Sequence, residues 1–344
     1  MSDLAGNPYA SIVELSKAYL NKSVSPSEVT KAQLARIDIL DAKLGSYQTI
    51  YSDEALAAAK AADKAYTEDA RLGPFHGIPF ALKDIYELKG QITTCGSYEM
   101  RQRISTETGT VVRRLLEVGG IAIGKTKTVE CALGGWGTNE HMGTPWNPWD
   151  LEHPRVPGGS SSGSGVAVAS GLASCATGSD TGGSVRLPAA YCGLTGLKVS
   201  KACLPTDGIM PLSQTLDTPG PMTRNMADLA LMFSIMTGID GRKIETDMMN
   251  GHGLFNIQMN IFKGLKFGII DQKERSRCTD DILKSYDETL NLLVDLGAEL
   301  EVFTSPVAYD DMAQFNGAIT MYEGYRNHRH LYDDPSKSMD QNVK

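Results

Sequence analysis

"PGGSSSGSGVAVASGLASCATGSDTGGSVR", residues 157–186, places two glycine-rich turns on either side of a run of small, mostly apolar residues. Glycine and serine runs alone are typical of flexible linkers, because they bury little apolar surface and lose much entropy when they become ordered. A linker would lead into a new domain, whereas the first turn here leads without a polar spacer into residues 165–173. Two turns that bracket a closely packing element therefore indicate an ordered loop.

Three kinds of chemistry suit such turns. Backbone amides of a glycine-rich turn before a helix bind phosphate, but the Lys-Ser or Lys-Thr ending of the Walker motif is absent. "GSSSG", residues 159–163, matches a nucleophile elbow with Ser161 at its centre, which requires a later acid and histidine. The histidines that follow, His252, His328 and His330, stand in no motif. The third interpretation is a serine nucleophile served by a lysine.

Lys83 is a candidate for that lysine. It closes the apolar stretch "GIPFALKD", residues 77–84, which predicts a buried strand. An ordinary lysine is protonated at neutral pH, so it accepts a proton only where burial or a neighbouring charge lowers its pKa. Taken alone, Lys83 also fits the common case of a solvated lysine at the end of a strand.

Outside this stretch the pattern alternates between helices and strands. Ser25 followed by Pro26 and Glu28 forms a capping box for a helix over residues 25–44, and residues 53–66 favour a second helix. The later segments alternate in type: strands at 77–84, 121–125, 265–270 and 298–303, and helices at 108–120, 225–238 and 279–297. This alternation favours a mostly parallel sheet with helices on both faces.

Composition limits the partners. The chain has 344 residues and a net charge of −8, so a nucleic acid or an anionic membrane is not expected to bind it. Its six cysteines are scattered and predict buried free thiols, and no cluster with metal-ligand spacing predicts a metal site. No stretch is apolar over about 18 residues, and the first residues do not resemble a signal peptide. A cytoplasmic enzyme acting on a small molecule is expected.

Taken together, "GIPFALKD", "PGGSSSGSG" and "GSDTGGSVRLPAAYCGLTGLKVS", in this order, resemble the amidase signature family, whose members cleave amides with a Ser-Ser-Lys triad. The resemblance runs from about residue 72 to 238. It implies an α/β fold with a central mixed, largely parallel sheet covered by helices on both faces. It also implies a helical N-terminal segment, 1–70, packed on an amidase signature domain, 71–344, which is expected to be incomplete at its C-terminus.

By this resemblance Ser184 is the nucleophile, Ser160 is the bridging serine held by a cis peptide, and Lys83 is the base. Hydrolysis of an amide also needs donors for the oxyanion that forms as the carbonyl becomes tetrahedral. The backbone N–H groups of the turn around the nucleophile are candidates, namely those of Thr181, Gly182, Gly183 and Ser184. Ser162 stands where the family usually has glycine.

Supporting and substrate-binding roles are expected nearby. Ser161, Asp180 and Arg186 are expected to brace the two turns rather than to react. The loop "ECALGGWGTNEHMGTPWNPWD", residues 130–150, resembles the family's substrate-side loop. Its residues Gly134, Gly135 and Trp136 are candidates for the lining of the pocket.

The resemblance implies an amidase that hydrolyses a carboxylic amide to the acid and ammonia without a cofactor. The first alternative is the glutaminase A subunit of the tRNA-dependent amidotransferase, which works with partner subunits. That subunit usually carries a Ser-rich, "SSTENS"-like stretch before "NPWD", where this chain has "GGWGTNEHMG". The second alternative is an inactive fragment or binding protein. For the stand-alone enzyme a homodimer is one assembly that the sequence leaves open, and the sequence does not fix the oligomeric state.

Overall fold

The computed structural model describes residues 6–250, 252 and 262–344. Its contacts divide the chain into two compact units, which are described separately. The first comprises Met1–Asp247 with Asn316–Lys344, and the second comprises Met248–Phe315. The division expected at residue 70 falls within the first unit, and the second unit lies within the expected 71–344 domain.

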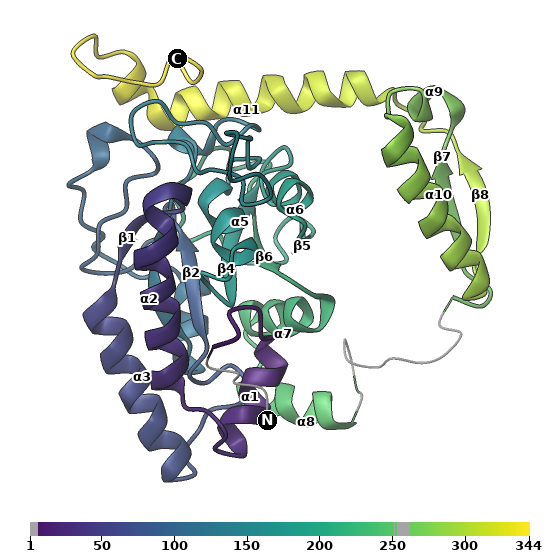
Figure 1. The fold of residues 1–344 in the computed structure, drawn as a ribbon. Helices are drawn as coiled ribbons and strands as arrows, with labels where there is room; N and C mark the ends of the chain where they lie inside the picture. The colour runs from purple at the N-terminus through teal and green to yellow at the C-terminus, as the bar shows by residue number, and fades with distance from the viewer. Residues whose placement is uncertain (1–5, 251, 253–261) are drawn as a thin grey trace. The chain divides into compact units, whose positions relative to one another are not determined.

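The elements follow the chain as labelled in Figure 1. The helices are α1 Ile12–Leu20, α2 Pro26–Leu44, α3 Ser52–Thr67, α4 Thr110–Glu117, α5 Ser162–Ala169, α6 Arg186–Cys192, α7 Met226–Thr237, α8 Gly241–Asn250, α9 Gln272–Arg275, α10 Asp280–Asp295 and α11 Tyr309–Tyr332. The strands are β1 Tyr47–Ile50, β2 Pro79–Lys83, β3 Ile121–Thr126, β4 Cys175–Asp180, β5 Thr195–Gly196, β6 Thr218–Thr223, β7 Lys266–Ile270 and β8 Glu299–Phe303. Short 3-10 turns occupy Tyr98–Met100 and Glu130–Ala132.

A six-stranded mixed sheet in the order β1-β3-β2-β4-β6-β5 forms the centre of the first unit. Strand β2 is parallel to both β3 and β4, whereas the pairs β1–β3, β4–β6 and β5–β6 are antiparallel. The mixed α/β fold is therefore confirmed, with the parallel pairs limited to the three central strands. Strands β7 and β8, which the sequence suggested for the same kind of sheet, form a separate parallel pair in the second unit.

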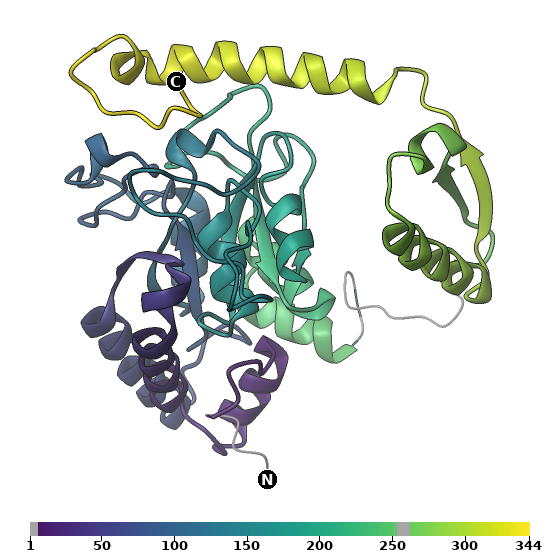
Figure 2. The ribbon, with the colours of Figure 1, turned by 45° about the horizontal axis from the view of Figure 1, so that its top comes forward.

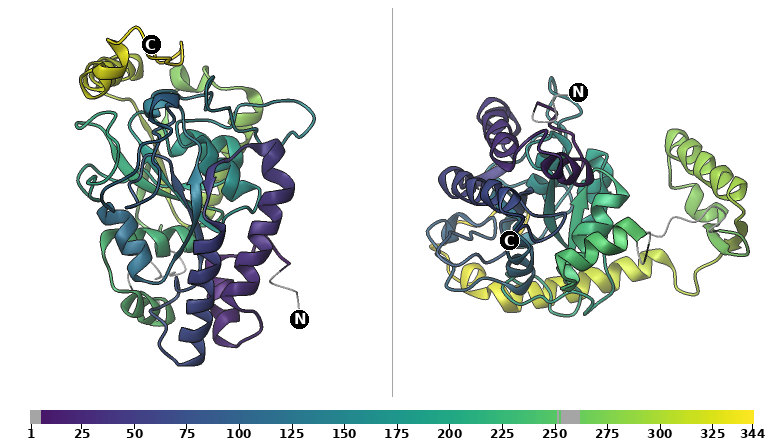
Figure 3. Two further views of the ribbon diagram at one scale, coloured as in Figure 1. Left: turned by 90° about the vertical axis from the view of Figure 1, so that its left-hand side faces the viewer. Right: turned by 90° about the horizontal axis from the view of Figure 1, so that it is seen from below.

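Right-handed connections explain how helices cover both faces of this sheet. The connection from β2 through α4 to β3 runs toward one edge, and the connection from β3 through α5 to β4 runs back past β2. Because parallel crossovers are almost always right-handed, these opposite directions place α4 and α5 on opposite faces. Helices α2 and α3 lie side by side in every view (Figures 1, 2 and 3).

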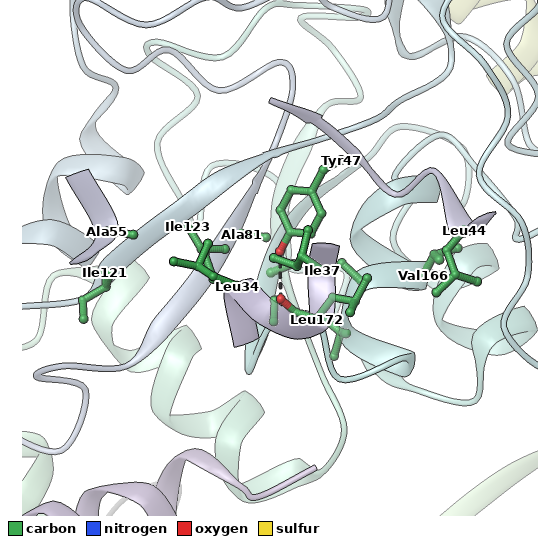
Figure 4. Close-up of a cluster of buried hydrophobic side chains, with 14 of the residues drawn as sticks. Leu34, Ile37, Leu44, Tyr47, Ala55, Ala81, Ile121, Ile123, Val166 and Leu172 are labelled. Carbon is green, nitrogen blue, oxygen red and sulfur yellow. Dashed lines mark hydrogen bonds between the residues drawn. The ribbon is translucent and has the colours of Figure 1, made fainter. Parts of the chain in front are cut away.

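A cluster of buried apolar side chains joins α2, α3 and α5 to the sheet (Figure 4). Leu34 and Ile37 of α2 contact the cluster that contains Ile123 of β3, and each large apolar side chain buried in this way contributes about 1.5–3 kcal/mol. The Tyr47 hydroxyl donates a hydrogen bond of 3.0 Å to the Leu172 carbonyl within it. The N-terminal segment is thereby fixed to the sheet.

Strand β1 lies within the segment that the sequence predicted to be helical. Helix α2 begins with the expected capping box of Ser25 and Glu28 and ends at Gly45, whose φ of +60° is the left-handed conformation that glycine adopts easily. The chain then extends, and Tyr47 pairs with Thr126 at the edge of the sheet. Residues 6–70 therefore contribute a strand as well as three helices.

Helix α5 is buried along most of its length because its residues are small. A Cβ atom at Gly163 would collide with the Ser46 carbonyl oxygen, so glycine is required where this helix meets the neighbouring backbone. The helix starts at Ser162, directly after Ser160 and Ser161. Its close packing fixes the position of those two serines.

Candidate active site

The predicted catalytic residues lie at the end of a central strand or in the loops beside the strand ends. Lys83 is the last residue of β2, Ser179 and Asp180 end β4, and Ser160 stands just before α5. Strands β2 and β4 are parallel, and ligands of open α/β sheets bind outside the carboxyl ends of such strands. The fold therefore brings together residues that are almost 100 positions apart in the sequence.

Lys83 is completely buried and contacts two serine hydroxyls. Its Nζ donates hydrogen bonds to Ser160 Oγ at 2.8 Å and to Ser179 Oγ at 2.9 Å. Burial lowers the Lys83 pKa from 10.5 to about 7, against an opposing effect of nearby groups that include Asp217 and Asp180. A substantial fraction of this lysine is therefore neutral near neutral pH. The sequence predicted the contact with Ser160, but not the one with Ser179.

The Ser/Gly stretch is an ordered loop, held on both sides. The Gly159–Ser160 peptide is cis, as the family resemblance implied. The Ser160 carbonyl accepts hydrogen bonds from Thr128 Oγ1 at 2.9 Å and from the Val129 amide at 3.3 Å. The Gly159 amide donates to the Gly135 carbonyl at 2.7 Å. These bonds exclude the interpretation of the stretch as a flexible linker.

Ser161 bonds to the end of β4 rather than facing solvent. It is fully buried, its hydroxyl accepts from the Ser179 amide at 3.2 Å, and the same hydroxyl lies 3.4 Å from the Ser179 carbonyl. These local contacts satisfy the hydrogen-bonding capacity of the Ser161 hydroxyl and explain why it is buried. An exposed nucleophile at Ser161, as an elbow would require, is absent from this site.

Ser184 lies beside this loop and is 8% exposed. Its carbonyl accepts a hydrogen bond from the Ser161 amide at 3.2 Å. Although both residues are within the described part of the chain, no hydrogen bond joins the hydroxyls of Ser184 and Ser160. Hydrogen bonds between catalytic groups often form only when substrate is present. The structure thus brings Lys83 and Ser160 into contact and joins Ser184 through its backbone to Ser161, the residue that follows Ser160.

Asp180 organises the turn that carries Ser184. Its carboxylate accepts from the Gly183 amide at 2.8 Å, from the Val185 amide at 3.1 Å, and from Arg186 Nε and Nη2 at 3.0 and 2.9 Å. Burial alone would raise the Asp180 pKa, but the hydrogen bonds from Arg186 and from these amides bring it below its ordinary value. The Gly183 amide thus donates to Asp180 in this structure, and its role as an oxyanion donor stays a prediction.

Two residues that the sequence analysis did not name also contact this turn. Thr181 Oγ1 donates to Asp217 Oδ1 at 2.5 Å, and Asn316 Nδ2 donates to the Thr181 carbonyl at 3.1 Å. Asp217 directly precedes β6 within the run "SQTLDTPGP", and Asn316 belongs to α11. No sequence motif connects either residue with Ser184, because only the fold makes them neighbours.

A small cavity of about 90 Å³ opens beside Ser179. Ile85 and Ala132 line part of its wall, and most of the rest comes from the segment between residues 206 and 219, including Asp217. No motif in the sequence marks this segment. Apolar side chains form much of the wall, and Lys201 and Asp217 are the charged residues among the described lining residues.

The predicted substrate residues Gly134, Gly135 and Trp136 do not line this cavity. Gly134 and Gly135 lie against the loop that contains Gly159, and the Trp136 side chain is 63% exposed. Their contact with substrate stays a prediction.

A buried ion pair stands next to Lys83 in the sheet. Lys125 Nζ lies 3.1 Å from Asp84 Oδ1, and both side chains are at most 1% exposed. Thr94 donates to the same carboxylate through its hydroxyl and its amide, and Lys125 also donates to Thr93 Oγ1 at 2.8 Å. Both charges are therefore compensated locally.

All six cysteines are free, and four of them are buried. Over the described ranges, no three His, Cys, Asp or Glu side chains are grouped so as to hold a metal ion. None of the helices described is both long and apolar enough to cross a membrane.

Comparison with known proteins agrees with this geometry. The family model named Amidase matches residues 28–343. The chain is 38% identical to the A subunit of glutamyl-tRNA(Gln) amidotransferase from Geobacter metallireducens over 299 residues, which cover 86% of this chain and 60% of that protein. It is 39% identical to the protein of the same name from Thioalkalivibrio sulfidiphilus over 291 residues, covering 84% and 59%. The chain thus spans about 60% of the length of these curated relatives.

Among solved structures, the native peptide amidase from Stenotrophomonas maltophilia superposes with a TM-score of 0.81 at 29% identity, covering 94% of this chain and 68% of that one. The A subunit of glutamyl-tRNA(Gln) amidotransferase from Thermotoga maritima gives a TM-score of 0.74 at 27% identity, covering 94% and 67%. Because the family model matches most of the residues, the chain belongs to the amidase family. Its fold is the amidase signature fold.

Proposed function

We propose that this chain carries the catalytic residues of an amidase that hydrolyses a carboxylic amide to the acid and ammonia. The observation that supports this most directly is the 2.8 Å contact between Lys83 Nζ and Ser160 Oγ, in a site that lowers the Lys83 pKa to about 7. A buried lysine of this kind serves as a general base, which an ordinary surface lysine does not.

In the proposed reaction Ser184 Oγ attacks the carbonyl carbon of the amide. Its proton passes to Ser160 as the Ser160 proton passes to neutral Lys83. The negative charge that forms on the carbonyl oxygen is met by the backbone amides of Thr181, Gly182 and Ser184, with the Gly183 amide, which donates to Asp180 in this structure, as the fourth candidate. One such donor typically contributes about 10²–10³ in rate.

The carbon–nitrogen bond then breaks. The proton held by Lys83 returns through Ser160 to the leaving nitrogen, which departs as ammonia. Water attacks the ester on Ser184 by the same proton transfers and releases the acid. Ser161, Asp180 and Arg186 hold the two turns in place in this scheme.

The proposed reaction uses no cofactor or metal, and its substrate is a small molecule rather than a nucleic acid. The proposal places the protein in the cytoplasm as a stand-alone enzyme, with a homodimer as one assembly to test. A second candidate is the glutaminase component of an amidotransferase, which would need partner subunits. It is favoured by the relatives named as A subunits of that amidotransferase, at 38% and 39% identity.

The test is release of ammonia from a panel of amides that includes glutamine, with Ser184→Ala as the inactive variant and Ser276→Ala, an exposed serine, as the matched control. We expect release from at least one amide, a loss of about 10³-fold or more in Ser184→Ala, and no change in the control. Release from glutamine alone would favour the amidotransferase component. Release that persists in Ser184→Ala would contradict the proposed nucleophile, and a correctly folded chain inactive on every amide would favour a binding protein.

A further inference from the structure

A groove of about 490 Å³ lies on the first unit, bordered by α2, the C-terminal end of α5 and the loop around Trp149. Arg36, Ile39, Leu40 and Lys43 line it from one face of α2, since residues three, four and seven positions apart lie on the same side of a helix. The groove shares no lining residue with the cavity beside Ser179. It is therefore a second site, separate from the proposed catalytic one.

The charges along this groove are all positive. Arg36, Lys43 and Arg224 line it, and among the described residues no aspartate or glutamate does, although the chain as a whole has a net charge of −8. Among the described residues none of the three cations forms a salt bridge. A cluster of cations without salt-bridge partners on an acidic protein attracts an anion.

Backbone carbonyls hold these cations in place without neutralising them. Arg36 Nε donates to the Ser170 carbonyl at 2.9 Å, and Arg224 Nη1 donates to carbonyls at the same end of α5. Lys43 donates to the Leu151 carbonyl. The bonds that Arg36 forms use Nε and Nη2, so that Nη1 is left to bind a ligand.

Arg224 has a buried Nε without a hydrogen-bond partner. Asp228 lies near enough to raise the Arg224 pKa, against the larger lowering by burial, but its carboxylate accepts from the Ile12 and Val13 amides and from Asn225. Because this Nε is buried, Arg224 contributes positive charge to the wall of the groove rather than a donor that a ligand reaches.

The rest of the groove is apolar and open. Leu40 and Leu194 line its floor, while Ile39 and Trp149 at its rim are 76% and 75% exposed. Large apolar side chains that stay exposed together commonly mark a binding surface. A volume of 490 Å³ is within the range of about 300–1,000 Å³ that holds small ligands.

We propose that this groove binds a monocarboxylate with a medium-length apolar body. The carboxylate accepts a charge-assisted hydrogen bond from Arg36 Nη1, and the apolar body lies over Leu40 and Leu194 toward Trp149. The proposal does not depend on the catalytic function, because it concerns different residues and its test measures binding.

The experiment titrates the full chain with decanoate, below the concentration at which decanoate forms micelles, and follows heat and tryptophan fluorescence. Decan-1-ol and decyltrimethylammonium serve as neutral and cationic probes of the same chain length. We expect saturable binding of decanoate, at least tenfold weaker binding of the other two, and a fluorescence change that is lost in Trp149→Phe while the heat remains.

Arg36→Gln should weaken decanoate binding about tenfold or more, and Arg36→Lys, which keeps the charge, should weaken it less. Arg329→Gln, which removes an exposed arginine on α11, is the matched control and should bind as the native chain does. Circular dichroism and thermal melting verify that each variant is folded. Should Arg36→Gln be unfolded, Leu40→Asp, which places a negative charge on the floor, is the second variant and should abolish binding.

Equal affinity for decanoate and decan-1-ol would overturn the proposal, since it would show an apolar surface without a carboxylate site. Unchanged binding in folded Arg36→Gln or Leu40→Asp would overturn it as well. So would a dimer in sedimentation that is lost in Leu40→Asp and unaffected by decanoate, because the groove would then be covered by a second copy of the chain.

Discussion

Replacing Lys83 with methionine should remove the base and at the same time stabilise the protein at neutral pH. The reason is the cost of burying an amine. Burial lowers the Lys83 pKa from 10.5 to about 7, so between these pH values the unfolded chain binds a proton that the folded chain does not. Folding stability contributed by this residue therefore rises with pH across that window.

The magnitude follows from that shift. At about 1.4 kcal/mol per pKa unit, the change from 10.5 to about 7 amounts to roughly 4–5 kcal/mol of destabilisation at and below pH 7. Methionine carries no charge, so the variant does not have this destabilisation. It does lose the hydrogen bonds to Ser160 and Ser179, each of which contributes about 1 kcal/mol to stability. We expect a net gain of about 2–3 kcal/mol at pH 7.

The assay is urea unfolding of the native chain and of Lys83→Met at pH 7, 8 and 9. The advantage of the variant should shrink by about 1.4 kcal/mol for each unit of pH, because the native chain gains stability while the variant has no amine to titrate. Other titrating groups are common to both chains and cancel in the difference. A difference that stays constant from pH 7 to 9 would refute the lowered pKa and, with it, the role of Lys83 as a base.

Two further changes test the supports of the site. Asp180→Asn should slow acylation of Ser184 more than tenfold and lower the free energy of unfolding by about 2 kcal/mol, because charge-assisted bonds to Arg186 and two amides are weakened. Asp150→Asn, in an exposed loop, is the control. Equal rates of Ser184 acylation in the two variants would contradict this prediction. Hydrogen bonds from Ser213 and Thr215 lower the Glu323 pKa from 4.5 to about 2, so its stabilisation is present above about pH 4.5 and lost toward pH 2. The melting temperature of Glu323→Gln should accordingly lie below that of the native chain at pH 6 and converge with it in acid. A difference in melting temperature that does not change with pH would contradict the lowered Glu323 pKa.

Local signals were sufficient to predict most elements of the fold. The capping box at Ser25 and the apolar runs around Lys83 and Ile123 specify helix and strand through nearby residues, and the structure has those elements. Strand β1 was not predicted, because its four residues become a strand only by pairing with β3. The separate pairing of β7 and β8 was likewise hidden, since a strand pattern does not say which strand is its neighbour.

The site shows the same division between local and long-range information. Lys83 and Ser160 were recognised from motifs, and the fold brings them to 2.8 Å. Asp217 and Asn316 were missed because their link to Thr181 spans 36 and 135 positions of sequence. The bond between Asp180 and the Gly183 amide was missed as well, because glycine in a turn indicates an accessible amide without saying what already binds it.

The central claim is that Ser184 is a nucleophile activated through Ser160 by Lys83. Intact-mass and peptide-map analysis after exposure to a small fluorophosphonate tests it most directly, with Ser184→Ala and Lys83→Ala beside the native chain. We predict a single adduct on Ser184, none in Ser184→Ala, and strongly slowed labelling in Lys83→Ala. An adduct on Ser161, or no adduct on a correctly folded chain, would contradict the account.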